Sequence, residues 1–220
     1  MTILHLNVLP SDNSAPLSAK MPLKSAQRWV SPNEGPDFTS LTQVFVDQDA
    51  YYRVMEHTAS DMENEVGGVL VGNWSAVPGT KQQFIVIEIA LPARFTRQGS
   101  AYLTFTQDSL VNINTEMDNR YPEKRIVGWY HTHPRMGIFL SQYDTWLHQH
   151  FFPESWQVAL VIEPHSSTGG FFIRQPGGAL DPDRYFGFYE IDGKSGISIV
   201  RWKNLRSDEE IDPEGERSNE

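Results

Sequence analysis

The sequence predicts one α/β (α+β) domain, and three features of the chain point to this class. The length of 220 residues is sufficient for a single domain with a sizeable core. Hydrophobic residues make up 39% of the chain and aromatic residues 12%, which is typical of a globular protein and excludes full disorder. Strand-like apolar segments alternate with segments of helical periodicity, and this order indicates helices packed around one sheet.

The expected strands follow from apolar alternation and from short apolar runs bounded by turn residues. They are predicted at residues 41–47, 65–74, 82–92, 100–106, 125–132, 156–164 and 169–176. The last two should form a hairpin, and residues 185–191 and 196–202 should form one further strand pair. Glycines in the second strand predict that another group approaches it closely.

Three segments have helical spacing of apolar residues and a capping residue at their start. They are residues 47–60, 108–121 and 141–152. The first is expected to open at an aspartate, and the second to open at Asp108 and to end at Pro122. The third begins with Ser141 and has Asp144 three residues further on, a pattern that resembles a capping box.

Both ends of the chain are expected to lie outside the folded domain, which we place at residues 39–203. Residues 9–38 contain five prolines and no sustained periodicity, so residues 1–38 are predicted to form an extended or flexible arm. Residues 204–220 contain seven acidic residues and two arginines, a net charge of -5 out of -10 for the whole chain. This composition predicts an acidic, disordered tail.

The composition also excludes several kinds of chemistry and partner. The chain has no cysteine, so any metal must be held by histidines and carboxylates. The net charge of -10, with no basic patch, argues against a nucleic-acid partner. No apolar run approaches the ~20 residues of a membrane-spanning helix, and the first residues lack the basic region of a secretory signal. We therefore expect a cytoplasmic protein without a membrane partner.

Four of the seven histidines lie within residues 127–152, and two of them, His131 and His133, are one residue apart. On an extended segment, side chains at i and i+2 point to the same side, so both rings can reach one ion. Pro134 directs the chain out of the strand, and a six-residue loop leads to the helix that carries Asp144. Two histidines, one carboxylate and a water form the open site that catalytic zinc keeps. The alternative is a purely structural role for these histidines.

His148 and His150 repeat the same spacing, but they are expected to lie on a helix. There, side chains at i and i+2 are about 200° apart, so these two should not share an ion. His148 follows Asp144 by one turn on the same face. Two interpretations stay open: an outer partner of the metal site, or an ordinary surface histidine.

Two separated motifs contain the candidate site. The longer one reads G-W-Y-H-T-H-P, then six residues, then S-x-x-D, and consists of Gly128, Trp129, Tyr130, His131, Thr132, His133, Pro134, Ser141 and Asp144. Glu65 opens the other, E-V-G-G-V-L-V-G, which precedes it in the chain. Together they resemble the signature of the JAMM (MPN-plus, JAB-domain) zinc metalloprotease family over about residues 41–175. Arg135 departs from the family, in which glycine is common at this position, and we expect this to affect substrate preference.

The resemblance implies a role for each residue of the site. The zinc ligands would be His131, His133 and Asp144, and no other cofactor is expected. Glu65 would act as the catalytic general acid and base, with Glu63 as a rival because it shares a side of the strand. Ser141 would donate a hydrogen bond to the developing oxyanion, although the same hydroxyl can simply cap the helix.

The resemblance further implies a fold and an activity. The fold is the JAMM/MPN (cytidine-deaminase-like) fold, a curved, mixed, mostly antiparallel sheet flanked by helices. Catalytic members hydrolyse the amide or isopeptide bond after the C-terminal tail of a ubiquitin-like protein, so such a protein or its conjugate is the expected substrate. The chain resembles the smaller prokaryotic, deubiquitinase-like members. Two alternatives are the release of cysteine or another adduct from a sulfur-carrier protein, and a non-catalytic MPN scaffold. The oligomeric state stays open.

Overall fold

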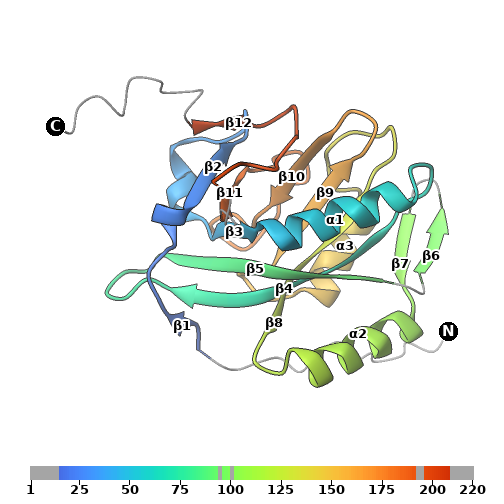
Figure 1. Ribbon diagram of the computed structural model, residues 1–220, viewed down its shortest axis with the longest axis horizontal. Helices are drawn as coiled ribbons and strands as arrows, with labels where there is room; N and C mark the ends of the chain where they lie inside the picture. The colour runs from blue at the N-terminus through green and yellow to red at the C-terminus, as the bar shows by residue number, and fades with distance from the viewer. Residues whose placement is uncertain (1–14, 94–95, 100–101, 192–195, 209–220) are drawn as a thin grey trace.

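The computed structural model describes residues 15–93, 96–99, 102–191 and 196–208, and these form a mixed sheet with helices on both faces (Figure 1). The strands of the sheet are β1 (Leu17–Ser18), β2 (Ala26–Val30), β3 (Gln43–Asp47), β4 (Gly67–Ala76), β5 (Gln83–Pro92), β8 (Arg125–Thr132), β9 (Val158–Glu163), β10 (Thr168–Phe172), β11 (Phe188–Ile191) and β12 (Arg206–Ser207). Their order is β10-β9-β8-β4-β5-β3-β11-β2-β12, with β1 beside β4. The expected α/β class, with a mixed sheet flanked by helices, is confirmed.

Antiparallel pairing dominates around the middle of the sheet, where β4 lies between β5 and β8. Parallel pairs join β8 to β9, β5 to β3, and β3 to β11. The glycines of β4 allow the close approach that the sequence predicts. A Cβ atom at Gly68 would lie 2.2 Å from the carbonyl oxygen of Leu91 on β5. A separate antiparallel pair consists of β6 (Thr96–Gly99) and β7 (Tyr102–Phe105).

The sheet separates two hydrophobic cores because neighbouring residues of its strands point to opposite faces. One core includes Leu70 and Leu160 and packs against α1 (Gln48–Ser60). The other includes Val69 and Val161 and packs against α2 (Gln107–Arg120) and α3 (Gln142–Phe151). In Figure 1, α1 lies in front of the central strands, α3 lies behind them and α2 lies below them. The described residues also contain the short helices η1 (Leu23–Ser25) and η2 (Pro36–Ser40).

The caps of the three long helices agree with the sequence in two cases and differ in one. Asp47 caps α1 by accepting a hydrogen bond from the backbone N–H of Asp49, as expected. Ser141 caps α3. Helix α2 differs, because the hydroxyl of Thr106 caps it, two residues before the expected cap Asp108. Threonine and aspartate are both good caps, so local sequence alone did not decide between them.

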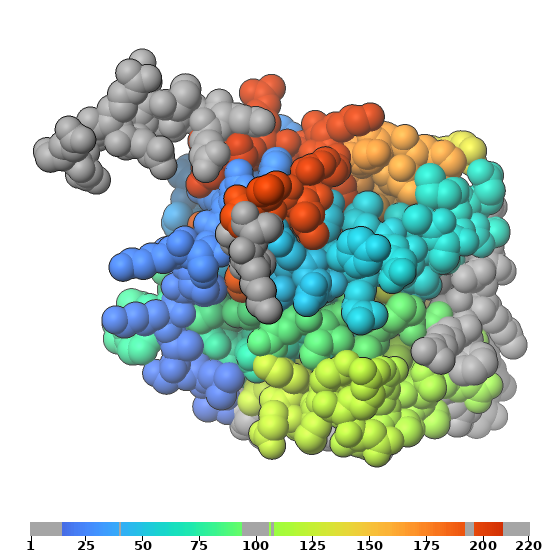
Figure 2. Space-filling model, viewed as in Figure 1, coloured from blue at the N-terminus to red at the C-terminus, as the bar shows by residue number. Residues whose placement is uncertain are grey.

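Parts of the two segments that we expected outside the domain lie in the sheet. Strand β2 falls within the expected arm and pairs with β11 and β12, and β12 falls within the expected tail. Trp29 of β2 donates its indole N–H to the carboxylate of Glu190, and Phe38 is buried in the core. In Figure 2 the C-terminal segment, coloured orange and red, covers the surface next to α1. The expected arm before residue 15 and the tail after residue 208 lie outside the described residues.

The strand pair expected from residues 185–191 and 196–202 is wrong in its second half. Residues 188–191 form β11, but residues 196–202 contain no strand. The N–H of Ile199 donates to the carboxylate of Glu190 at 2.8 Å in place of a strand partner. Trp202 fills the core over Gly169, where a Cβ atom would lie 2.5 Å from the indole ring. The apolar alternation of this segment therefore reflects packing against the domain.

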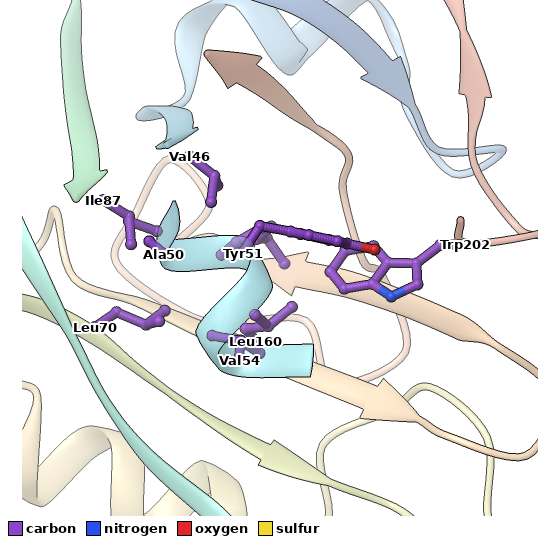
Figure 3. A pocket seen from close by; sticks show the side chains of 9 residues that line it. Val46, Ala50, Tyr51, Val54, Leu70, Ile87, Leu160 and Trp202 are labelled. Atoms are coloured by element: carbon purple, nitrogen blue, oxygen red, sulfur yellow. The ribbon is translucent and has the colours of Figure 1, made fainter. Parts of the chain in front are cut away.

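A small apolar hollow lies between α1 and the sheet (Figure 3). It is lined by Val46, Ala50, Tyr51, Val54, Leu70, Ile87, Leu160, Phe171 and Trp202. A hollow of this kind lacks the polar partners that would hold an ordered water or orient a ligand. We therefore interpret it as a space within the core.

No helix in the described part of the chain is long and apolar enough to cross a membrane.

Candidate metal centre

Strand β8 places two imidazole rings side by side at its carboxyl end. The Nε2 atoms of His131 and His133 lie 2.9 Å apart, and both rings are buried. The extended backbone positions them, because residues i and i+2 of a strand share a side. His131 is paired with Gly67 of β4, and the N–H of His133 donates to the carbonyl of Ile162 at 2.8 Å. The expected convergence of the two rings is therefore present.

The first turn of α3 brings a carboxylate to these rings. Asp144 Oδ1 lies 3.4 Å from His131 Nε2, and Asp144 Oδ2 lies 3.5 Å from His133 Nε2. A capping box fixes the carboxylate: the N–H of Ser141 donates to Asp144 Oδ2 at 2.7 Å, and the N–H of Asp144 donates to the Ser141 hydroxyl at 3.1 Å. The chain thus holds Asp144 through the same local structure that begins the helix.

These three side chains have the donor types and spacing of a tetrahedral zinc site. Bonds of about 2.0–2.1 Å in a tetrahedron place neighbouring ligand atoms roughly 3.3–3.4 Å apart. The two Nε2 atoms are 2.9 Å apart, and each lies 3.4 or 3.5 Å from a different oxygen of the Asp144 carboxylate. A small shift of the rings and the carboxylate would therefore admit the ion. The Nδ1 atoms of His131 and His133 are buried and have no hydrogen-bond partner. The group fits a metal that leaves one corner open.

The ionisation of these groups favours metal binding. Burial lowers the pKa of His131 and outweighs the opposing effect of Asp144, so the ring is neutral and its nitrogen can bind a metal. Burial alone would raise the pKa of Asp144. The electrostatic interaction with His131 and the hydrogen bonds from His131, His133 and Ser141 outweigh burial and bring the pKa of Asp144 well below its usual range. The site therefore offers a neutral imidazole at His131 and an ionised carboxylate at Asp144.

Glu65 lies just before β4 and is 2% exposed. Thr132 lies between the two histidines and is bonded to Val66, the residue that follows Glu65. The N–H of Thr132 donates to the Val66 carbonyl, and the hydroxyl of Thr132 accepts from the Val66 N–H, each at 2.9 Å. Glu65 Oε2 is buried without a partner. Burial, followed by the charge of Asp144, raises the pKa of Glu65 to about 8. A buried carboxyl with a free oxygen, close enough to Asp144 to feel its charge, can serve as a proton acceptor and donor.

Glu63, the rival for that role, points elsewhere. Its carboxylate is 67% exposed and forms two hydrogen bonds with the guanidinium of Arg135, at 2.8 and 3.0 Å. Arg135 has a φ of 61°, the left-handed region that glycine adopts most easily. The side chain that stands where glycine is common therefore forms an ion pair on the surface.

Ser141 is partly buried at the rim of the site and caps α3. Its hydroxyl oxygen accepts from the Asp144 N–H, so the hydroxyl proton is left to donate to another group. The two roles left open by the sequence, helix cap and hydrogen-bond donor, are therefore compatible in one side chain.

One residue near the site was not identified from the sequence. Glu163, at the end of β9, accepts hydrogen bonds from the backbone N–H groups of Arg135, His165 and Ser166 at 3.0, 2.9 and 2.7 Å. It thereby holds the loop that follows His133 against the turn between β9 and β10. The sequence signal is an acidic residue that ends an apolar strand before Pro164, and this signal is too common to single out the residue.

A family comparison identifies the chain. A family model described as "JAB1/Mov34/MPN/PAD-1 ubiquitin protease" matches residues 39–153, a range that contains Glu65, both histidines and Asp144. The chain belongs to this family, and the resemblance inferred from the two motifs is confirmed.

Three curated relatives match parts of the chain. NAD(+) hydrolase TcpA of Theionarchaea archaeon (strain DG-70-1) is 31% identical over 122 residues, or 55% of this chain and 34% of that protein. COP9 signalosome complex subunit 5 of Caenorhabditis elegans is 30% identical over 176 residues, or 73% of this chain and 43% of that protein. 26S proteasome non-ATPase regulatory subunit 14 of Drosophila melanogaster is 28% identical over 141 residues, or 63% of this chain and 44% of that protein. The chain spans less than half the length of each relative.

Proposed function

We propose that the protein is a zinc-dependent isopeptidase or peptidase that hydrolyses the amide bond after the C-terminal tail of a ubiquitin-like protein. The observation that carries the proposal is the buried group of His131, His133 and Asp144, whose ligand atoms all lie within 4.8 Å of one another. Membership of a family whose model is named for a ubiquitin protease supports the substrate class. The cysteine-free sequence is the ground for placing this activity in the cytoplasm.

The three ligands would hold zinc through two imidazole nitrogens and one carboxylate oxygen. Zinc bound in this way acts as a Lewis acid and lowers the pKa of a bound water towards about 7. A cation at these ligands also favours the ionised form of a nearby carboxyl, so it would oppose the raised pKa of Glu65. Glu65 would then be ionised at neutral pH, as a general base must be.

Glu65 and Ser141 would carry out the proton transfer and the charge stabilisation. Glu65 takes a proton from the attacking water as the new C–O bond forms, and it then passes this proton to the leaving amine as the amide C–N bond breaks. The Ser141 hydroxyl donates a hydrogen bond to the oxygen on which negative charge develops. The low exposure of Glu65 and of the three ligands strengthens these interactions by excluding water.

A tail that ends in two glycines suits such a buried centre. Residues without side chains can pass close to the protein backbone and adopt the extended conformation that a narrow path requires. We therefore infer a ubiquitin-like protein with a diglycine end as the substrate, present as a conjugate or as a precursor.

The proposal is tested by incubating zinc-loaded protein with ubiquitin-like proteins that carry three kinds of C-terminal extension: an isopeptide-linked lysine, a linear peptide and a cysteine adduct. We expect about one zinc per chain and cleavage after the second glycine of the isopeptide or linear substrate. Asp144→Ala should lose both the metal and the cleavage. Cleavage of the cysteine adduct alone would favour a sulfur-carrier substrate. A protein that binds no zinc and cleaves nothing would contradict the proposal and favour a scaffold.

A further inference from the structure

His148 is a buried histidine of α3 that the proposed reaction does not use. Its side chain is fully buried, and its Nδ1 accepts a hydrogen bond from the indole N–H of Trp129 on β8 at 3.0 Å. The sequence left open whether it is an outer partner of the site or a surface histidine. The second interpretation is wrong, because the helix face that carries Asp144 is turned towards the sheet.

The indole of Trp129 connects this histidine to a candidate metal ligand. Its ring is stacked on the imidazole of His131, with ring centres 4.5 Å apart and planes 6° from parallel. Trp129 and His131 are two residues apart on β8, and Asp144 and His148 are one turn apart on α3. Strand and helix are therefore joined at two successive levels, His131 with Asp144 and Trp129 with His148.

The hydrogen bond between Trp129 and His148 involves none of the three candidate metal ligands, and His148 keeps one protonation state near neutral pH. Because Nδ1 accepts the indole proton, the neutral His148 ring carries its own proton on Nε2. Burial, followed by the charge of Arg174, lowers the pKa of His148 to about 3, so the ring stays neutral. Arg174 also donates to the carbonyl of Phe152, which follows the last residue of α3. The helix is thus held at its start, along its inner face and at its end.

We propose that His148 is a positioning residue for the metal centre. Through its bond to Trp129 it sets the plane of the indole on which His131 rests, and it fixes α3 so that Asp144 reaches both histidines. This inference rests on the metal site of the proposed function but not on the substrate. Outer partners that orient a metal ligand typically change metal affinity about 10–100-fold when removed.

The test compares His148→Leu with His148→Asn. Asparagine presents an amide oxygen near the position of Nδ1 and can accept the indole proton, whereas leucine has a similar size and no acceptor. Co²⁺ is titrated into the metal-free proteins, because its visible absorption reports both binding and ligand geometry. We expect His148→Leu to bind Co²⁺ at least about 10-fold more weakly than the parent with an altered spectrum, and His148→Asn to stay within about 3-fold.

A second readout needs no metal. In the metal-free protein, the indole N–H of Trp129 should exchange slowly and resonate downfield in the parent and in His148→Asn, and it should lose both properties in His148→Leu. Should His148→Leu fail to fold, Trp129→Phe carries the same expectation for Co²⁺, since it keeps a ring beside His131 but lacks the donor. Equal Co²⁺ affinities for the leucine and asparagine variants would overturn the positioning role alone. A parent that binds no Co²⁺ would overturn the metal site itself.

Discussion

The hydroxyl oxygen of Thr132 accepts a hydrogen bond from the backbone N–H of Val66 at 2.9 Å. This bond, with the backbone bond from the Thr132 N–H to the Val66 carbonyl, joins the two motifs of the site. Val66 directly follows Glu65, and Thr132 lies between the two histidines, so these two bonds link the proposed base to the proposed ligands at the end of the β4–β8 pairing. Sequence spacing brings neither motif to the other, and only the pairing of β4 with β8 does so.

Substitution of Thr132 by valine tests this connection. Valine has nearly the same shape but leaves the buried N–H of Val66 without an acceptor, which costs about 1–3 kcal/mol in unfolding free energy. We expect hydrolysis to slow because Glu65 is less well held, whereas zinc affinity should change little. Thr132→Ser keeps the acceptor and is the matched control. Chemical denaturation and zinc titration of the two variants provide the comparison, and equal stability and activity of valine and serine variants would count against the connection.

The raised pKa of Glu65 predicts a pH dependence of stability in the metal-free protein. The carboxyl has a pKa of about 8 in the folded chain against an ordinary value of 4.5. Below pH 4.5 it is protonated in both the folded and the unfolded state. As pH rises towards 8, the unfolded state releases its proton first, so the folded state loses roughly 3–5 kcal/mol relative to a chain without this group.

Denaturant unfolding of the parent and of Glu65→Gln between pH 4.5 and pH 8 measures this effect. The difference between the two should grow in favour of the glutamine variant as pH rises, and it should shrink when zinc is added. Parallel pH curves for the two metal-free proteins would show that Glu65 is ionised in the folded state at neutral pH without help from a cation.

The lowered pKa of Glu163 predicts the opposite pH dependence of stability. Burial alone would raise its pKa, but hydrogen bonds from Ser166, Arg135 and His165 lower the pKa to about 2. Its contribution to stability is therefore present above pH 4.5 and is lost as pH falls towards 2. Glu163→Gln should destabilise the protein by about 1–3 kcal/mol at pH 7 and by progressively less in acid. A stability difference that stays constant down to pH 2 would show that the charge has no part in holding the loop.

Substitution of Arg135 by glycine should have only a small net effect on stability. Glycine relieves the left-handed backbone strain at φ 61°, of order 1–2 kcal/mol, but makes the unfolded chain more flexible. The ion pair with Glu63 is exposed, with 59% and 67% of the two side chains accessible, so solvent screens it and its loss should change stability little. We expect Arg135→Gly to fall within about 1 kcal/mol of the parent, and Glu63→Gln isolates the ion pair. A loss above 2 kcal/mol would point to a further contact of the guanidinium.

Local sequence predicted the elements whose signals are contained within a few residues. Strand β8 has the predicted bounds, because its apolar residues are contiguous and Pro134 follows closely. The capping box of Ser141 and Asp144 was predicted for the same reason. The group of His131, His133 and Asp144 that could hold a metal is built from one strand end and one helix start, so these two local predictions together brought its three side chains together.

The features that the sequence did not reveal depend on pairing and packing over long distances. Strand β2 pairs with β11, about 160 residues later in the chain, and nothing within the proline-containing segment announces that partner. The burial of His148 depends on which face of α3 meets the sheet, and histidine is found in both environments. The alternation of residues 196–202 arises from contacts of Val200 and Trp202 with the core, and periodicity alone does not distinguish this from a strand.

The most direct test of the account is turnover by Glu65→Gln, measured together with its zinc content on the substrate that the parent cleaves. Glutamine keeps the size of the side chain but cannot accept the proton of the attacking water. We expect about one zinc per chain, as in the parent, and hydrolysis at least about 100-fold slower. A glutamine variant that keeps its zinc and cleaves as fast as the parent would contradict the assignment of Glu65 as the base and the mechanism built on it.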